Sequence, residues 1–169
     1  RDLKNFDKAL HDLDQCLSVQ PDFYEALWNK SLTLLLVGEY DLGWELYESR
    51  WSTPEFKSKV RKFSSPLWLG EDSLINKTIL IHSEQGLGDT LQFCRYINLF
   101  KDLSCTVLLE VERPLVTMMY SLLPKENIFE KGTQLPEFDY HCPMMSLPLA
   151  FKTIGITQIE NGPYLRPNA

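Results

Sequence analysis

The sequence lacks any long hydrophobic run. The most apolar stretches, such as residues 34–37 and 106–109, are only a few residues long, whereas a helix needs ~20 to span a bilayer. We therefore expect no membrane span. The residues after Arg1 show no succession of charged, apolar and small-residue segments, so we expect no signal peptide. We interpret the chain as a piece of a longer protein.

Cysteine and histidine are scarce. The three histidines and four cysteines are scattered, with no Cys-x-x-Cys pair and no metal-ligand spacing. We therefore expect a reduced, cytoplasmic protein that holds no metal.

The sequence also lacks an excess of basic residues. Its 17 basic and 23 acidic residues give a formal charge of −6. The sequence therefore lacks the excess of positive charge that binds a phosphate backbone. We expect no nucleic-acid partner. With 44% hydrophobic and 24% charged residues, the composition is that of an ordinary globular protein.

Residues 1–53 are predicted to form helical repeats. A shift of 34 residues aligns Phe6 with Tyr40 and Leu13 with Tyr47. Gly38 can end a helix in a left-handed turn, and Gly43 allows a partner helix to approach closely. The pattern resembles a tetratricopeptide repeat, although any helical hairpin with a glycine turn has similar features. The resemblance implies binding of a protein or peptide.

Trp44, Tyr47 and Trp51 follow one another at steps of three and four residues. Residues at these steps share one face of a helix. We expect this aromatic face to be covered, and the following domain is the simplest cover.

The periodicity changes after a stretch of residues 54–76, which we interpret as a linker. Residues 78–81 form a short β-branched run typical of a buried strand, and a glycine turn and a helical stretch to residue 101 follow. Further strands are predicted at 106–111, near 127–129 and at 138–141, with a helix opened by Pro114. Strands that alternate with helices predict a parallel α/β half-domain over residues 77–169.

The turn after the first predicted strand has the sequence SEQGLGDT at residues 83–90. A dinucleotide fingerprint would need a third glycine at Leu91, and the Gly-Lys-Ser/Thr ending of a P-loop is missing. We therefore expect no NAD, ATP or other cofactor. Asp89 and Gln92 have the spacing of a capping box, and capping alone can explain this aspartate. The same hydrogen bonds would keep it ionised, as a general base requires.

Several stretches together resemble bacterial tetratricopeptide proteins that carry a heptosyltransferase-like glycosyltransferase domain of GT-B type. The stretches are WLG at 68–70, residues 79–96 with the string EQGLGD, FDYH at 138–141 and SLP at 146–148. The resemblance implies α plus α/β architecture, with a Rossmann-like half that binds the acceptor. The half that binds the nucleotide sugar would lie outside this sequence, so this piece alone would be inactive.

By this resemblance Asp89 would be the catalytic base. The candidate substrate-binding residues are His82, Glu84, Gln85, Gly86, Gly88, Arg95 and His141. Arg95 would meet an anionic group or form an ordinary surface ion pair. The alternative function is a non-catalytic scaffold that binds proteins through its repeats.

Overall fold

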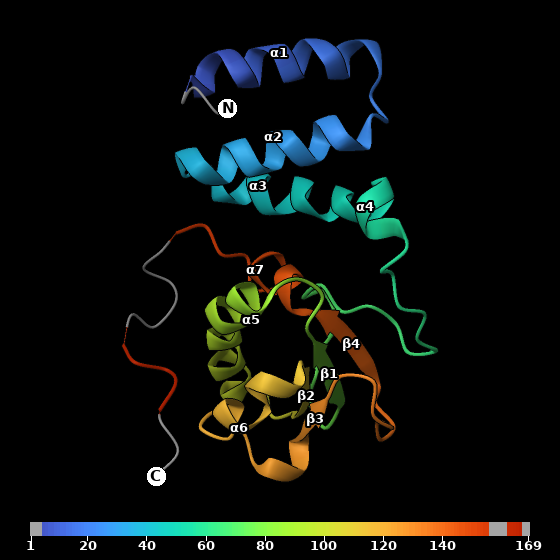
Figure 1. The fold of residues 1–169 in the computed structure, drawn as a ribbon, viewed down its shortest axis with the longest axis vertical. Coiled ribbons are helices and arrows are strands. Elements are labelled where there is room, and N and C mark those ends of the chain that lie inside the picture. Colours follow the sequence, from blue (N-terminus) through green and yellow to red (C-terminus); the bar gives the residue numbers. More distant parts are fainter. Residues whose placement is uncertain (1–4, 156–161, 167–169) are drawn as a thin grey trace. The chain divides into compact units, whose positions relative to one another are not determined.

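A computed structural model describes residues 5–155 and 162–166 of the chain. The chain divides into two compact units, Arg1–Lys62 with Lys152–Ile156 and Phe63–Phe151 with Thr157–Ala169. The first unit is helical and the second has a parallel sheet with helices (Figure 1). The predicted combination of helices followed by an α/β region is therefore confirmed. The division between the units falls inside the stretch predicted as a linker.

The helical unit is a succession of antiparallel helices. It contains α1 (Phe6–Val19), α2 (Tyr24–Val37), α3 (Tyr40–Tyr47), the 3₁₀ helix η1 (Glu48–Ser52) and the short α4 (Pro54–Lys57). The second helix packs against both α1 and α3 (Figure 1). An ion pair of 2.6 Å between Lys30 Nζ and Asp14 Oδ1 also joins α1 to α2.

Two glycines shape the turn between α2 and α3. Gly38 ends α2 with φ +92°, a left-handed conformation that glycine adopts without strain. Gly43 lies against α2, and a Cβ atom at Gly43 would come within 2.7 Å of Leu35 Cδ2. The close approach of α3 to α2 therefore depends on the missing side chain at Gly43.

The predicted aromatic face finds partners within its own unit. The guanidinium group of Arg50 lies 4.7 Å from the ring centroid of Tyr47 and 4.3 Å from that of Trp51. Arg50 is fully buried, and its Nη1 also donates to Glu48 Oε1 at 2.6 Å. The ring of Phe56 on α4 contacts Trp51 edge-on. The buried Arg50 cation of η1 thus has both aromatic and carboxylate neighbours.

The α/β unit is built on four parallel strands among the described residues. These are β1 (Thr78–His82), β2 (Thr106–Val111), β3 (Ile128–Glu130) and β4 (Tyr140–Pro143). Their order in the sheet is β3-β2-β1-β4. Nearly every residue of β1 and β2 is buried, as expected for central strands with both faces covered.

Short helices connect the strands (Figure 1). Between β1 and β2 the chain forms α5 (Leu87–Phe93) and the 3₁₀ helix η2 (Cys94–Asp102). The connection from β2 to β3 contains η3 (Arg113–Leu115), α6 (Val116–Met119) and η4 (Lys125–Asn127). After β4 come η5 (Met144–Ser146) and α7 (Leu147–Ala150).

The segment before β1 belongs to the sheet unit. Trp68 N–H donates to His141 O at 2.8 Å, and His141 N–H donates to Pro66 O at 3.0 Å, so this segment runs parallel to β4 at the edge of the sheet. The buried Trp68 ring packs against Phe100 and Phe151. Trp68 therefore contributes to the core of this unit.

No helix within the described residues is both long and apolar enough to cross a membrane.

Candidate functional site

The strand order places a topological switch point between β1 and β4. From β1 the chain continues to β2 and β3 on one side, and it then returns to pair β4 with the other side of β1. In open α/β sheets, ligands bind beyond the carboxyl ends of the strands at such a point. The glycine turn at residues 83–88 follows β1 at this position.

The structure corrects the expected role of Asp89 at the helix start. Helix α5 begins at Leu87 with Gly86 at the N-cap, so Asp89 is the third helical residue and does not cap the helix itself. Its Oδ2 accepts the backbone N–H of Gly86 at 3.0 Å. The sequence spacing with Gln92 was misleading because glycine can occupy an N-cap without any side chain.

The glycine turn is open to solvent. Gly86, Leu87 and Gly88 are exposed, whereas Asp89 is half-buried. A Cβ atom at Gly88 would meet nothing within 4 Å, but one at Gly86 would lie 3.3 Å from Asp89 Oδ2. The turn therefore presents an accessible backbone with a carboxylate fixed beside it.

A polar cluster that we did not predict lies under the turn. Ser83 Oγ donates to Glu112 Oε1 at 2.9 Å, and Thr90 Oγ1 lies 3.5 Å from Glu112 Oε2. Lys131 Nζ lies 3.1 Å from Glu112 Oε1 and 3.1 Å from the carbonyl oxygen of Ser83. The cluster joins the ends of three neighbouring strands to the first turn of α5.

The pKa of Glu112 reflects two opposed effects. Partial burial raises it, but hydrogen bonds from its own backbone N–H, Ser83 and Lys131, together with the charge of Lys131, lower it more. The net pKa is below the ordinary value, so Glu112 stays ionised.

A positional signal in the sequence points to this cluster. Glu112 directly follows β2, and Lys131 directly follows β3. Because the carboxyl ends of parallel strands meet at one edge of a sheet, polar residues directly after each strand are expected to lie close together. The sequence pattern of β3 is too weak to locate the end of this strand, so it did not predict that Lys131 lies near Glu112.

The two histidines come together on one face of the sheet. His141 is opposite Leu80 in the register, so it shares a face with His82, and His82 Nε2 lies 3.3 Å from His141 Nδ1. The ring of Phe63 packs against both. His82 is only 4% exposed. The two histidines therefore pack with Phe63 on one face of the sheet.

Arg95 points to the C-terminal segment of its unit. Its guanidinium group lies 4.5 Å from the ring centroid of Tyr164, and Nη2 is 3.2 Å from the Tyr164 hydroxyl oxygen. That hydroxyl donates to Leu91 O at 2.9 Å. The structure thus places an aromatic ring beside the Arg95 guanidinium group, and a contact of Arg95 with an anionic substrate group remains a prediction.

Glu84 and Gln85 are half-buried neighbours in the turn, and Gln85 Nε2 donates to Glu84 Oε1 at 3.4 Å. The candidate site therefore contains Glu84, Gln85 and Gly86 in the loop after β1, and Gly88 and Asp89 in the first turn of α5. Across the part of the chain that the structure describes, no group of three or more His, Cys, Asp or Glu residues could hold a metal ion.

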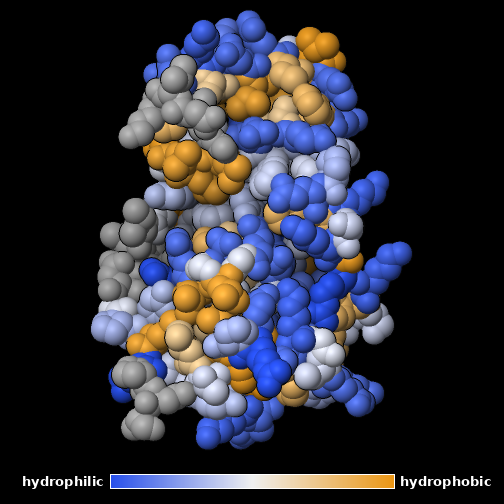
Figure 2. Space-filling model, viewed as in Figure 1, coloured by the Kyte–Doolittle hydropathy of each residue, from blue (hydrophilic) through white to orange (hydrophobic). Residues whose placement is uncertain are grey.

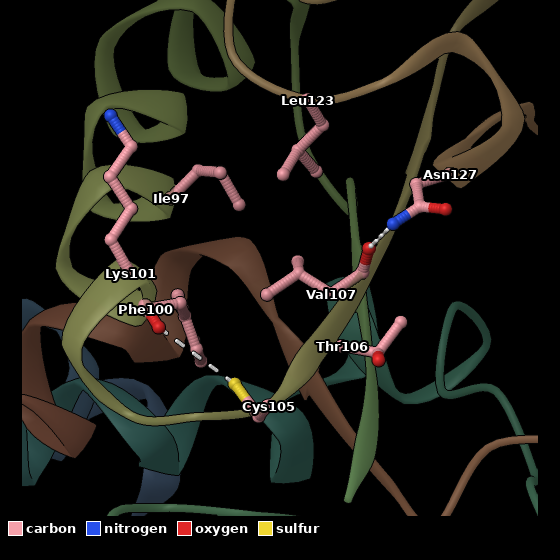
Figure 3. A pocket seen from close by; sticks show the side chains of 8 residues that line it. All are labelled: Ile97, Phe100, Lys101, Cys105, Thr106, Val107, Leu123 and Asn127. Carbon is pink, nitrogen blue, oxygen red and sulfur yellow. Dashed lines mark hydrogen bonds between the residues drawn. The ribbon is translucent and has the colours of Figure 1, made fainter. Parts of the chain in front are cut away.

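A separate hollow of about 240 Å³ lies beside the start of β2 (Figure 3). Ile97 and Phe100 line it from η2, and Val107 lines it from the start of β2. Asn127 Nδ2 donates to Val107 O at 3.0 Å across its rim. Burial raises the pKa of Cys105, which keeps this thiol neutral. The lining combines apolar side chains with the polar Lys101, Cys105, Thr106 and Asn127.

Fold and site together define a parallel α/β unit with a glycine turn at its switch point, preceded along the chain by a helical unit. The chain is similar to Protein FlbA from Caulobacter vibrioides (strain ATCC 19089 / CIP 103742 / CB 15), with 30% identity over 138 residues. The match covers 75% of this chain but only 22% of the relative, so the chain spans about a fifth of that protein's length. No protein-family profile matches the chain, and no solved structure matches it.

Proposed function

We propose that this chain supplies the acceptor-binding half of a glycosyltransferase of GT-B type, joined to tetratricopeptide-like helices. The observation that carries the proposal is Asp89, a carboxylate fixed beside an exposed glycine turn at the switch point of a parallel sheet. Ligands of open α/β sheets bind at this position.

Asp89 would act as the general base. Its Oδ2 is oriented by Gly86 N–H, which leaves Oδ1 to accept the proton of an acceptor hydroxyl. The hydroxyl oxygen then forms a bond to the anomeric carbon of the donor sugar, and the bond from that carbon to the nucleotide phosphate breaks. The phosphate oxygen takes the electron pair and leaves with the nucleotide.

The glycines would admit the acceptor to the backbone. Gly88 has free space where a Cβ atom would stand, and Gly86 leaves room for the Asp89 carboxylate. The nucleotide sugar would bind to a second α/β half elsewhere in the whole protein. The reaction as proposed requires no metal.

The test is a transfer assay on the longer protein that contains this chain. Asp89→Asn keeps the shape of the side chain but removes the base, and we expect the transfer rate from a nucleotide sugar to fall by roughly 10²–10⁴-fold. Asp102→Asn is the matched control, because Asp102 is exposed at the end of η2. An undiminished rate with Asp89→Asn would exclude Asp89 from the chemistry.

The second candidate function is a scaffold that binds proteins through the helical unit. Hydrophobic surface lies on this unit (Figure 2), and Val19, Leu36 and Leu42 are 86%, 62% and 43% exposed. Exposed apolar side chains on a helical repeat are available for contact with a partner. The sequence that follows Ala169 in the whole protein distinguishes the candidates. A second βαβ half there supports the transferase, and its absence supports the scaffold.

A further inference from the structure

The carboxylate of Glu112 contacts both ends of the segment that contains the glycine turn. Oε1 accepts the hydroxyl of Ser83, which precedes the turn, at 2.9 Å. Oε2 lies 3.5 Å from the hydroxyl oxygen of Thr90, which directly follows Asp89. A residue on a neighbouring strand connection thus bridges the start and the end of residues 83–90.

Lys131 holds this carboxylate in place from a third direction. Its Nζ lies 3.1 Å from Glu112 Oε1 and donates at 3.1 Å to the carbonyl oxygen of Ser83. Charge-assisted hydrogen bonds of this kind are stronger than neutral ones. The Glu112 side chain therefore has partners on both oxygens.

Burial makes these contacts costly to lose. Ser83 is 1% exposed and Thr90 is 2% exposed, so solvent has little access to replace Glu112 as their partner. Buried hydroxyl groups without a partner destabilise the conformation that buries them. Ser83 therefore depends most on Glu112, because Glu112 accepts its buried hydroxyl at 2.9 Å, whereas the Thr90 hydroxyl also has Gly86 O within 3.2 Å.

We propose that Glu112 is a positioning residue that fixes residues 83–90 and thereby the carboxylate of Asp89. Ser83 anchors the segment at the end of β1. Thr90 anchors it in the first turn of α5, where its hydroxyl donates to Gly86 O at 3.2 Å and lies 3.5 Å from Glu112 Oε2. Asp89 lies between these anchors. The proposal rests on the proposed function for the use of Asp89 as a base, but the fixation of the turn is independent of it.

Amide hydrogen exchange of this chain, measured by NMR, tests the fixation directly. The informative amides are Gly86 N–H, bonded to Asp89 Oδ2, and Thr90 N–H, bonded to Gly86 O. In Glu112→Gln one carboxylate oxygen becomes an NH₂ group, which cannot accept a hydrogen bond. We expect both amides to exchange about tenfold faster, because a charge-assisted hydrogen bond is lost, while Leu80 and Ile81 in β1 keep their rates.

Glu126→Gln is the matched control. Glu126 is exposed in η4, and this substitution removes the same negative charge as Glu112→Gln. Ser83→Ala is a second variant that removes one anchor and leaves Glu112 intact. Unchanged exchange at Gly86 and Thr90 in both variants would overturn the proposal. An equal acceleration in β1 would also overturn it, because the effect would then be global.

The transfer assay separates this proposal from the proposed function. If Glu112 acts through Asp89, Glu112→Gln lowers the rate in the natural background about tenfold and has little further effect in the Asp89→Asn background. Independent losses that multiply would contradict positioning. If Asp89→Asn alone has no effect, the proposed function fails, and the exchange experiment still decides whether Glu112 fixes the turn.

Discussion

The carboxylate of Asp89 turns back along its own helix and accepts the backbone N–H of Gly86, three residues earlier, at 3.0 Å. This bond satisfies one of the N–H groups that have no partner inside a helix. It also fixes the carboxylate at the solvent-exposed side of the turn. The two glycines of this turn consequently have different roles.

We predict that alanine has opposite effects at Gly86 and Gly88. At Gly86 a Cβ atom would stand 3.3 Å from Asp89 Oδ2, and alanine is a poor N-cap, so Gly86→Ala lowers the free energy of unfolding by about 0.5–1 kcal/mol. Gly88 lies inside α5 with open space around it, so Gly88→Ala raises that free energy by roughly 0.5–1 kcal/mol. Urea unfolding measures both, and equal effects of the same sign would contradict the prediction.

Gly70 is the glycine whose replacement we expect to be most harmful. It has φ +99°, and a Cβ atom there would overlap the carbonyl oxygen of Ala150. Backbone cannot yield as a flexible side chain can, so Gly70→Ala lowers the free energy of unfolding by about 3 kcal/mol or more. Gly132 is the control, with φ +91° and open space. Gly132→Ala costs only about 1–2 kcal/mol of backbone strain, and thermal unfolding of the two variants compares them.

Glu112 makes the stability of the α/β unit depend on pH. Its folded pKa is lowered from an ordinary value of 4.5, so its contribution to stability is fully present above the unfolded pKa. That contribution is lost as the pH falls from about 4.5 through the folded pKa. In Glu112→Gln we expect a smaller loss of unfolding free energy between pH 7 and pH 3, measured by urea titration at each pH.

Asp139 adds a separate contribution in the acid range. Hydrogen bonds from Thr78 N–H and Lys77 lower its pKa below 3.8, and its effect has the same sign. The Glu112→Gln variant should therefore retain part of the pH dependence. A curve for this variant that coincides with that of the unchanged chain would contradict a role for Glu112.

The cysteines should differ in their reaction with a thiol reagent at pH 8. Burial raises the pKa of Cys94 to about 12, and Cys142 is fully buried, so neither reacts in the folded chain. Cys16 and Cys105 are half-exposed, but burial also raises the pKa of Cys105. We expect Cys16 to react first, then Cys105, and the other two only in denaturant. Mass spectrometry of the labelled peptides identifies the order.

Local patterns in the sequence predicted the two central strands and the glycine turn that ends α2. The β-branched run at residues 78–81 and the strand at 106–111 correspond to β1 and β2, and Gly38 ends α2 in the left-handed conformation. These features depend on neighbours in the sequence. For β4 the predicted range began two residues too early, because this short strand is defined by its pairing with β1.

Relations between distant segments were not accessible from local patterns. The sequence predicted Asp89 beside a glycine turn, but not that Glu112 and Lys131 bond to the residues around it. Nor does any local signal show that Trp68 pairs with His141. Such contacts arise only when the strand order is known. The proposed roles of His82, Glu84, Gln85 and His141 in substrate binding remain predictions.

The strand order also has a consequence for how the α/β unit folds. The bond between Thr78 and Asp139, at the start of the β1–β4 pair, closes a loop of 61 positions, whereas Asn127 and Val107, beside the β2–β3 pair, are 20 positions apart. Longer loops cost more entropy to close, so non-local strand pairs form slowly. We expect β4 to join the sheet last. The switch point beside the glycine turn would then be completed only in the final stage of folding.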